Sequence, residues 1–274
     1  MKPSNFDYCR PDSVDEALSL LSEYGDDARI IAGGQSLMAM LNLRLAAADV
    51  LIDIGRLQEL SECRQVGGYL EVGAAVTQAK LLNYPGLAEI QPLLAKALPN
   101  VGHFQTRNRG TVCGSIAHAD PSSEIPLCLA ALEGEVVLRS ASGTRTLSAA
   151  DFQTGMLATA IAPGEMITAA RFPVAEQGAG YAFAEVARRR GDFAIVGLAA
   201  IARNGTLRLG AGGVAGKPAI LEWQIEAGQL DDALNGFAWE MEGEDDIHAT
   251  AKYRRQIVRQ LGRKVLEEAK SCSS

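Results

Sequence analysis

Cysteine and histidine are scarce in this sequence, and neither is spaced as a metal site requires. The five cysteines are odd in number, no two of them form a C-x-x-C pair, and the three histidines lie far apart. Disulfide frameworks use an even number of cysteines, and iron–sulfur clusters or structural zinc sites use clustered thiolates and imidazoles. We therefore expect no disulfide framework and no metal or iron–sulfur site held by this chain alone.

Positive charge is also low, and no apolar run is long. The chain has 26 Lys and Arg residues against 33 Asp and Glu residues, a net charge of −7, so electrostatics gives no reason to expect nucleic acid or an anionic membrane as a partner. Gly, Arg or Asp interrupts each apolar run well short of a membrane span, and the first residues lack the apolar segment of a secretory signal. The expectation is a cytoplasmic protein.

The length and composition suit two domains with sizeable buried cores. The chain has 274 residues, of which 47 % are hydrophobic and 22 % are charged, an ordinary globular profile. The run Glu176–Gly180 is the best candidate for a linker, because glycine and polar residues mark exposed connections. We expect one domain over residues 1–176 and a second over residues 177–274.

A glycine pair follows the first clear strand signal. Residues 28–54 read in order as an apolar strand, a turn, a short helix and a second apolar strand, which predicts a β–loop–α–β unit with Gly33 and Gly34 on the strand-to-helix turn. Two interpretations stay open. The glycines form a simple tight turn, or the backbone N–H groups of residues 33–37 and the Ser36 hydroxyl cradle a diphosphate.

A second stretch, residues 111–124, again combines hydroxyl groups with a glycine. Thr111 and Ser115 lie on either side of Gly114, where a backbone can approach a ligand closely because glycine has no Cβ. His118 follows in the same stretch and has no neighbour in sequence that would make it a base. A packing or structural hydrogen-bonding role is the simpler interpretation of His118.

Two acidic residues close this stretch. Asp120 followed by Pro121 predicts the start of a helix that continues through Leu132, because Asp is a favoured N-cap and Pro a favoured first helical residue. Glu124 would then lie on the same face of that helix. The two carboxylates either cap the helix and offset its dipole, or accept hydrogen bonds from hydroxyl groups or a ring N–H of a ligand.

The C-terminal part has the pattern of a small antiparallel sheet followed by a helix. Residues 181–186, 194–202 and 206–210 form three apolar runs that predict strands, and Asn204-Gly205 between the last two is a strong hairpin signal. The charged tail over residues 245–270 is expected to be helical.

A basic run with an aromatic residue connects the first two of these strands, and it reads Arg188-Arg189-Arg190-Gly191-Asp192-Phe193. Such a run is usually a solvated face of a protein. Phe193 is large and apolar, so it is expected to cover either the domain interface or the ring of a ligand.

A further glycine-rich stretch does not indicate a nucleotide site. Residues 210–215 match the pattern G-x-G-x-x-A, but they follow a late strand and run into Pro218, and no helix begins on the glycines. Dinucleotide-binding glycines require a strand before them and a helix opening on them. The dinucleotide interpretation of this stretch is therefore rejected.

Three stretches, taken together and in order, resemble one protein family. They are Ala32–Leu37 with Met40–Leu45, Arg107–Pro121, and Arg188–Ala194. The sequence resembles the FAD-binding medium subunits of molybdenum hydroxylases, the family of carbon monoxide dehydrogenase and xanthine dehydrogenase. The resemblance covers nearly the whole chain. It implies an α+β protein, in which a two-lobed FAD-binding domain of the p-cresol methylhydroxylase and vanillyl-alcohol oxidase type, divided near residues 56–60, precedes a three-stranded antiparallel sheet plus helices.

The resemblance also implies which residues contact FAD. Residues 33–37 and 111–115 would hold the diphosphate and its surroundings, Asp120 and Glu124 would bond hydroxyl or ring groups, and Phe193 would lie near the isoalloxazine. The full implied set is Ala32, Gly33, Gly34, Gln35, Ser36, Leu37, His103, Thr111, Gly114, Ser115, His118, Asp120, Glu124, Asp192 and Phe193. The resemblance implies no catalytic residue and no metal ligand in this chain.

Two positions depart from the family pattern. Cys113 stands where the motif usually has the first glycine of Thr-Ile-Gly-Gly, so its side chain must point away from the cofactor. Many relatives carry a lysine near Glu185, and we do not assign the role of that lysine to Glu185.

The function implied by the resemblance is electron transfer within a multi-subunit oxidoreductase. A small partner subunit with [2Fe-2S] clusters would pass electrons to FAD in this chain, and FAD would pass them to an external acceptor. A large partner subunit with molybdopterin would hydroxylate the substrate, in a heterohexamer arranged as a dimer of heterotrimers. Two alternatives stay open: a self-contained FAD-dependent oxidoreductase on the same fold, and a nucleotide-binding module without enzymatic activity.

Overall fold

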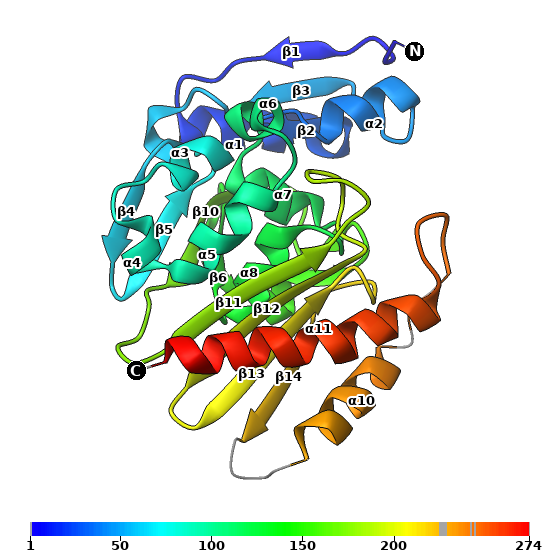
Figure 1. Cartoon of the computed structure of the whole chain (residues 1–274). Helices are drawn as coiled ribbons and strands as arrows, with labels where there is room; N and C mark the ends of the chain where they lie inside the picture. Colours follow the sequence, from blue (N-terminus) through cyan, green and yellow to red (C-terminus); the bar gives the residue numbers. More distant parts are fainter. Residues whose placement is uncertain (1, 225–228, 242, 244, 274) are drawn as a thin grey trace.

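Three sheets, each with its own helices, follow one another along the chain (Figure 1). The structure is a computed structural model that describes residues 2–224, 229–241, 243 and 245–273. The N-terminal lobe lies at one end of the molecule and the C-terminal sheet with its long helix lies at the other. A five-stranded sheet with several short helices lies between them. The fold is α+β, as the sequence predicts.

The N-terminal lobe is built on a three-stranded parallel sheet with the order β1-β3-β2. Its elements are β1 (Asp7–Cys9), α1 (Val14–Tyr24), a 3-10 turn (Gly25–Asp27), β2 (Ala28–Ile31), α2 (Leu37–Leu43) and β3 (Val50–Asp53). The predicted β–loop–α–β unit is confirmed as β2–α2–β3. Helix α1 begins after Ser13, whose Oγ accepts a hydrogen bond from the backbone N–H of Glu16 at 3.1 Å.

The middle sheet has five antiparallel strands in the order β4-β5-β10-β6-β7. They are β4 (Cys63–Val66), β5 (Tyr69–Gly73), β6 (Glu135–Ser140), β7 (Gly143–Ser148) and β10 (Met166–Pro173), and a 3-10 turn (Gln58–Leu60) leads into them. Side chains alternate between its two faces, as they do along any strand. Leu70 and Phe172 are fully buried in the main core, whereas Glu71 and Arg171 lie on the opposite, polar face.

Short helices connect the strands of the middle sheet. They are α3 (Gln78–Leu82), α4 (Leu87–Ile90), α5 (Pro92–Ala97), a 3-10 turn (Leu98–Asn100), α6 (Phe104–Arg109), α7 (Val112–His118), α8 (Glu124–Ala131) and α9 (Ala149–Phe152), with a small hairpin of β8 (Gln153–Gly155) and β9 (Ala158–Thr159). Helices α4 and α5 are separated at Gln91, because the proline that follows disfavours a helical conformation there.

The C-terminal sheet has four antiparallel strands, so the prediction of three is wrong. The elements are β11 (Gly180–Val186), β12 (Val196–Arg203), β13 (Thr206–Gly212), β14 (Ala219–Gln224), α10 (Leu230–Glu240) and α11 (Ala251–Cys272). The hairpin at Asn204-Gly205 is confirmed, and both residues have positive φ, 48° and 76°. The helical tail begins at Ala251, later than expected, because Thr250 caps it.

The two faces of the C-terminal sheet contact different parts of the molecule. Helix α11 crosses one face (Figure 1), where Ala182 and Leu198 form a second hydrophobic core with it. On the other face, Tyr181 and Ile201 join the main core together with α5 and α8. The sheet is therefore packed between its own helices and the helices of the preceding part.

The glycines of the excluded dinucleotide pattern allow α8 to lie close to this sheet. A Cβ at Gly210 would lie 3.0 Å from Cδ1 of Leu127, and a Cβ at Gly212 would lie 3.0 Å from the carbonyl oxygen of Pro121. Both distances are tighter than side chains normally tolerate. Gly210 and Gly212 thus have a packing role, which agrees with rejecting a dinucleotide site here.

The start of β11 and the end of α11 lie against each other in space, although they are the two ends of the C-terminal segment. A Cβ at Gly180, the first residue of β11, would lie 1.8 Å from the carbonyl oxygen of Ala269 in the last turns of α11. Only glycine permits that approach of the two backbones.

None of the described helices is both long enough and apolar enough to cross a membrane. All five cysteines are free thiols. Within the described residues, no three His, Cys, Asp or Glu side chains gather as metal ligands would. The domain limits, 1–176 and 177–274 with a lobe division near 56–60, stay predictions.

Candidate functional site

The loop at residues 33–37 lies directly against the start of the second stretch. A Cβ at Gly33 would lie 2.1 Å from the carbonyl oxygen of Arg109 and 2.8 Å from Cα of Gly110. The segment just before Thr111 is in turn held by the start of α3, since the N–H of Gln78 donates to the Gly110 carbonyl at 2.8 Å. The structure therefore brings the two predicted stretches together, and it does so through backbone contact.

The same loop presents unpaired backbone donors. Among the residues that the structure describes, none accepts a hydrogen bond from the backbone N–H groups of residues 33–37. The Ser36 hydroxyl does not cap α2, although Ser36 occupies the N-cap position, and the Gln35 amide turns back to the Gly33 carbonyl at 3.3 Å. Backbone N–H groups are strong donors that structures normally pair with acceptors or water. This loop can therefore bind an anionic or carbonyl oxygen.

The second stretch contains a helix, α7, that begins after Thr111. Thr111 is the N-cap of α7 and is 3 % exposed, and its Oγ1 accepts a hydrogen bond from the Gly114 N–H at 3.0 Å. The Thr111 hydroxyl oxygen thus stabilises the helix start, a role typical of threonine at this position.

One face of α7 carries no large aliphatic or aromatic side chain. Its buried face has Val112, Cys113 and Ile116, whereas Gly114 and Ala117 are exposed and Ser115 and His118 are half-buried. The buried thiol of Cys113 lies 3.5 Å from the carbonyl oxygen of Val72 in β5, so it points into the core as expected. The opposite, nearly bare face offers a surface on which a flat or extended ligand can lie.

Asp120 does not start the next helix, so that prediction is wrong. Its Oδ1 accepts a hydrogen bond from the Ser122 N–H at 2.8 Å, and its carbonyl accepts one from the Ser123 N–H at 3.0 Å. Asp120 thus closes a turn, and α8 begins at Glu124 after the N-cap Ser123. An Asp-Pro pair favours a turn as well as a helix start, and here the turn forms.

Glu124 is therefore the first residue of α8, and it is buried with 6 % of its surface exposed. The pKa of its carboxyl is raised to about 7, mainly by burial and also by the charges of Glu185 and Asp120, while its own backbone N–H and the charge of Arg107 act to lower it. A carboxyl group with such a pKa is partly protonated near neutral pH. It can accept or donate a hydrogen bond there.

The loop between β11 and β12 closes the site from the C-terminal sheet. A Cβ at Gly191 would lie 2.7 Å from Nδ1 of His103, so this loop touches the residue that precedes α6. Phe193 is 64 % exposed, which excludes the interdomain core as its position. The half-buried Asp192 closes the loop through its backbone N–H, which donates to the Arg189 carbonyl at 3.1 Å.

Glu185 is a residue of this region that the sequence does not assign. It lies in β11, and burial raises the pKa of its carboxyl to about 7. Its Oε2 is buried and has no hydrogen-bond partner within the described residues. The alternation Tyr181, Phe183, Glu185 along the predicted strand is the signal that could have placed its side chain toward α8.

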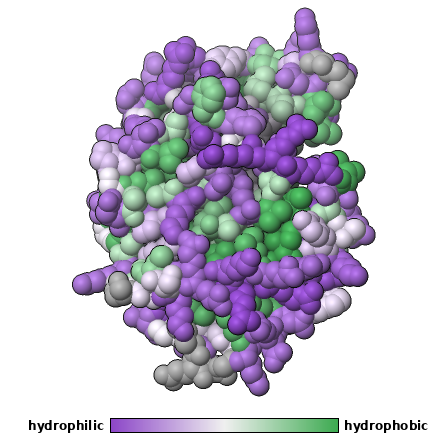
Figure 2. Space-filling model, viewed as in Figure 1, coloured by the Kyte–Doolittle hydropathy of each residue, from purple (hydrophilic) through white to green (hydrophobic). Residues whose placement is uncertain are grey.

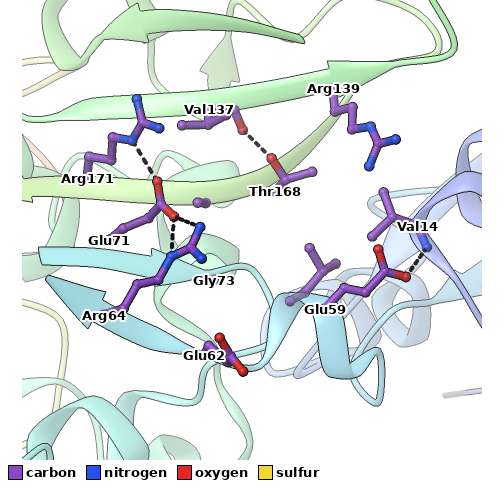
Figure 3. A pocket seen from close by; sticks show the side chains of 12 residues that line it. Val14, Glu59, Glu62, Arg64, Glu71, Gly73, Val137, Arg139, Thr168 and Arg171 are labelled. Atoms are coloured by element: carbon purple, nitrogen blue, oxygen red, sulfur yellow. Dashed lines mark hydrogen bonds and ion pairs between the residues drawn. The ribbon is translucent and has the colours of Figure 1, made fainter. Parts of the chain in front are cut away.

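Hydrophobic surface gathers across the middle of the face drawn in Figure 2, between the N-terminal lobe and α11, and hydrophilic side chains surround it. A hollow of about 290 Å³ lies elsewhere, on the polar face of the middle sheet (Figure 3). None of the predicted site residues lines it. Three of its charged side chains are paired with one another, since Glu71 accepts hydrogen bonds from Arg64 at 2.7 Å and Arg171 at 2.8 Å.

Comparison with known proteins shows to which family this chain belongs. The family described as FAD binding domain in molybdopterin dehydrogenase matches residues 4–175, and the CO dehydrogenase flavoprotein C-terminal domain matches residues 181–269. The chain belongs to the FAD-binding medium subunits of molybdenum hydroxylases. It is 36 % identical over 288 residues to the nicotine 6-hydroxylase medium subunit of Paenarthrobacter nicotinovorans, which covers 98 % of this chain and 99 % of that protein.

This medium subunit also matches solved structures of its family along its whole length. It superposes on carbon monoxide dehydrogenase of Hydrogenophaga pseudoflava with a TM-score of 0.93, 32 % identity and complete coverage of both chains. Quinoline 2-oxidoreductase of Pseudomonas putida 86 gives a TM-score of 0.90 and 33 % identity, with 99 % of each chain covered. The expected fold, the FAD-binding domain and the oxidoreductase class are confirmed, and the alternative of a module without enzymatic function is set aside.

Proposed function

We propose that this medium subunit binds FAD across the loop at residues 33–37, the bare face of α7 and the loop at residues 187–193. FAD would take electrons from [2Fe-2S] clusters of a small partner subunit and pass them to an external acceptor. The observation that carries the proposal is the contact of Gly33 with Arg109 and Gly110. It joins five unpaired backbone N–H groups to the start of α7.

The residues present suit the parts of FAD. The N–H groups of residues 33–37 are donors for the two phosphates, which glycine allows to come close. The face of α7 with Gly114 and Ala117 is open enough for an extended chain. Phe193, exposed at 64 %, supplies an apolar surface for a ring. Bound FAD supplies the electron-accepting chemistry, because it exchanges electrons singly or in pairs.

The remaining implied contacts are also part of the proposal. Asp120 and Glu124 would accept hydrogen bonds from FAD, and Glu124 is positioned for this by the start of α8. His118 lies in the last turn of α7 and is half-buried, and His103 lies beside Gly191 at the opposite side of the site. We assign these side chains binding and orienting roles. Hydroxylation of the substrate belongs to a different subunit in this proposal.

The proposed assembly is a dimer of heterotrimers in the cytoplasm. Its large subunit would carry molybdopterin and hydroxylate the substrate, and its small subunit would carry the iron–sulfur clusters. The relatives are named as medium subunits or chains of carbon monoxide dehydrogenase and of nicotine 6-hydroxylase, names that imply further subunits. The substrate would then be chosen by the large subunit, and not by this chain.

Purification of the native complex, with flavin, molybdenum and iron analysis, tests the proposal. We expect a flavin absorption spectrum in this chain, and molybdenum and iron only when a larger and a smaller chain copurify. Substrate is then added to the complex and to the isolated chain. If the bound flavin is reduced in the complex but not in the isolated chain, electron transfer between subunits is supported. Substrate oxidation by the isolated flavin-loaded chain would instead show a self-contained oxidoreductase.

A further inference from the structure

Two carboxyl groups from separate elements, Glu124 and Glu185, lie where the charge of Glu185 acts on Glu124. Glu124 is the first residue of α8, and Glu185 lies near the end of β11. Along β11, Tyr181 and Phe183 pack on the main core that contains α8, while Ala182 and Ala184 pack on the core with α11. Strand alternation therefore puts Glu185 on the side of the sheet that faces α8.

Neither carboxyl group is compensated by a cation. Glu124 is more than nine-tenths buried, and within the described residues no other residue donates a hydrogen bond to its carboxylate. The buried Oε2 of Glu185 also lacks a hydrogen-bond partner there. An uncompensated buried charge is costly, and a group in that position takes up a proton instead.

The other charged groups around the pair do not remove this cost. Asp120 adds a further negative charge near Glu124, and the buried thiol of Cys128 stays neutral because burial raises its pKa. Arg107 is the opposing cation, but its Nη1 donates to the carbonyls of Val101 and Gly102 at 2.9 and 2.8 Å. It therefore forms no ion pair with either glutamate. Burial raises the pKa of both carboxyl groups to about 7.

We propose that Glu124 and Glu185 hold one proton between them, and that this medium subunit binds FAD in the form that carries this proton. The inference rests on the proposed function, since it concerns the same site. Two ionised glutamates would repel the negatively charged diphosphate of FAD as well as each other. With one proton, the pair offers an O–H donor beside a carboxylate acceptor. The flavin ring edge has carbonyl oxygens next to an N–H, so it can use both.

The proposal predicts how FAD affinity depends on pH. Below the range in which the pair loses its shared proton, affinity is constant. Above it, a required proton makes the dissociation constant rise up to about tenfold per pH unit. The proton is taken up from solution when FAD binds at high pH. A purely structural role for either glutamate would produce neither effect.

The experiment is a titration of FAD-free full-length chain with FAD, followed by flavin fluorescence, at pH values from 6 to 9. The range starts above the calculated isoelectric point of about 5.1, where the chain stays charged. Wild type is compared with Glu185→Gln and with Glu240→Gln. Glu240 is exposed on α10, so its replacement removes the same charge without touching the pair. Calorimetry in two buffers of different ionisation enthalpy measures proton uptake at pH 8.

We expect wild type and Glu240→Gln to lose affinity above about pH 7 and to take up about one proton per FAD at pH 8. Glu185→Gln should bind as tightly as wild type at pH 6, show no loss up to pH 9 and take up no proton, because a neutral amide cannot ionise. Glu124→Gln serves as a second variant if Glu185→Gln does not fold. A flat wild-type profile, or an unchanged slope in Glu185→Gln, overturns the inference while FAD binding stands. Absence of FAD binding by wild type at every pH overturns the proposed function itself.

Discussion

The two glycine-bearing stretches of the site use glycine in different ways. In residues 33–37 the glycines leave backbone N–H groups unpaired and allow the loop to touch Arg109. In α7 the N–H of Gly114 is already paired with Thr111, and the glycine instead keeps one helix face free of side chains. The first stretch therefore offers donors and the second offers a surface. Similar sequences, rich in glycine and hydroxyl groups, give different contributions to one site.

The first prediction removes the contact on which this comparison depends. In Gly33→Ala the new Cβ would overlap the Arg109 carbonyl, only 2.1 Å away, so the loop must move away from α7. Such overpacking costs about 1–3 kcal/mol of stability, and we expect loss of bound FAD. Flavin content and thermal melting measure the two effects. Gly236→Ala is the control, because a Cβ at Gly236 in α10 would meet nothing within 4 Å. Normal flavin content in folded Gly33→Ala would contradict the role of the loop.

The second prediction concerns a substitution that covers the bare face of α7 and should leave the fold intact. Ala117→Leu puts a larger side chain on an exposed helical position, where leucine is a good helix former. We expect unchanged melting of the FAD-free chain and FAD affinity at least about tenfold weaker, because displacing a leucine side chain costs about 1–3 kcal/mol. Ala88→Leu, exposed on α4, should leave the affinity unchanged. Equal FAD affinity of both variants would show that nothing lies on this face.

The third prediction addresses the ring surface, which neither glycine stretch supplies. Phe193→Ala should leave the fold intact, shift the flavin absorption band and speed reoxidation of reduced flavin by oxygen. An aromatic contact contributes about 0.5–1.5 kcal/mol beyond area burial, so FAD affinity should fall roughly 2- to 10-fold. Stopped-flow spectroscopy of the reduced protein measures the reoxidation rate. If spectrum and rate both match wild type, Phe193 does not contact the flavin.

The smallest expected effect concerns Glu185 of β11, in the FAD-free chain. The pKa of Glu185 is raised to about 7 in the folded state, above the ordinary value of about 4.3 in an unfolded chain. The folded state therefore binds this proton more tightly, and the stability it contributes is present at low pH and lost as the pH rises through about 7. Glu185→Gln should melt roughly 1–3 °C above wild type at pH 8, and by less at pH 6. A difference independent of pH would contradict the raised pKa.

Local signals predicted the parts of the fold that local interactions determine. The apolar runs and glycine turn of residues 28–54 gave the β2–α2–β3 unit, and Asn204-Gly205 gave the hairpin between β12 and β13. The Asp120-Pro121 pair was misread, because the same residues favour a turn or a helix start and only the surrounding packing decides. Strand β14 follows Pro218 and gains its place by pairing with β13, which no local pattern reports.

In the candidate site, too, the features set by local sequence were predicted and those set by tertiary packing were missed. The resemblance implied residues 33–37 and 111–124 as one site, but the contact of Gly33 with Arg109 depends on tertiary packing. Helix α6 holds Arg107 near Glu124, which no local motif indicated. Glu185 was not assigned, because its burial depends on the packing of β11 against elements distant in sequence, α5 and α11 among them. Spacing along a chain reveals neighbours on one element, and it does not reveal neighbours across elements.

The meeting of Gly180 with Ala269 has a consequence for how such proteins evolve. A unit whose entry and exit adjoin can be inserted into another chain, or circularly permuted, without stretching its backbone. The four-stranded sheet with α11 is therefore portable as a block. Exchange of this block between relatives would replace the loop at residues 187–193, and with it one wall of the site, while the loop at residues 33–37 and α7 stayed in place.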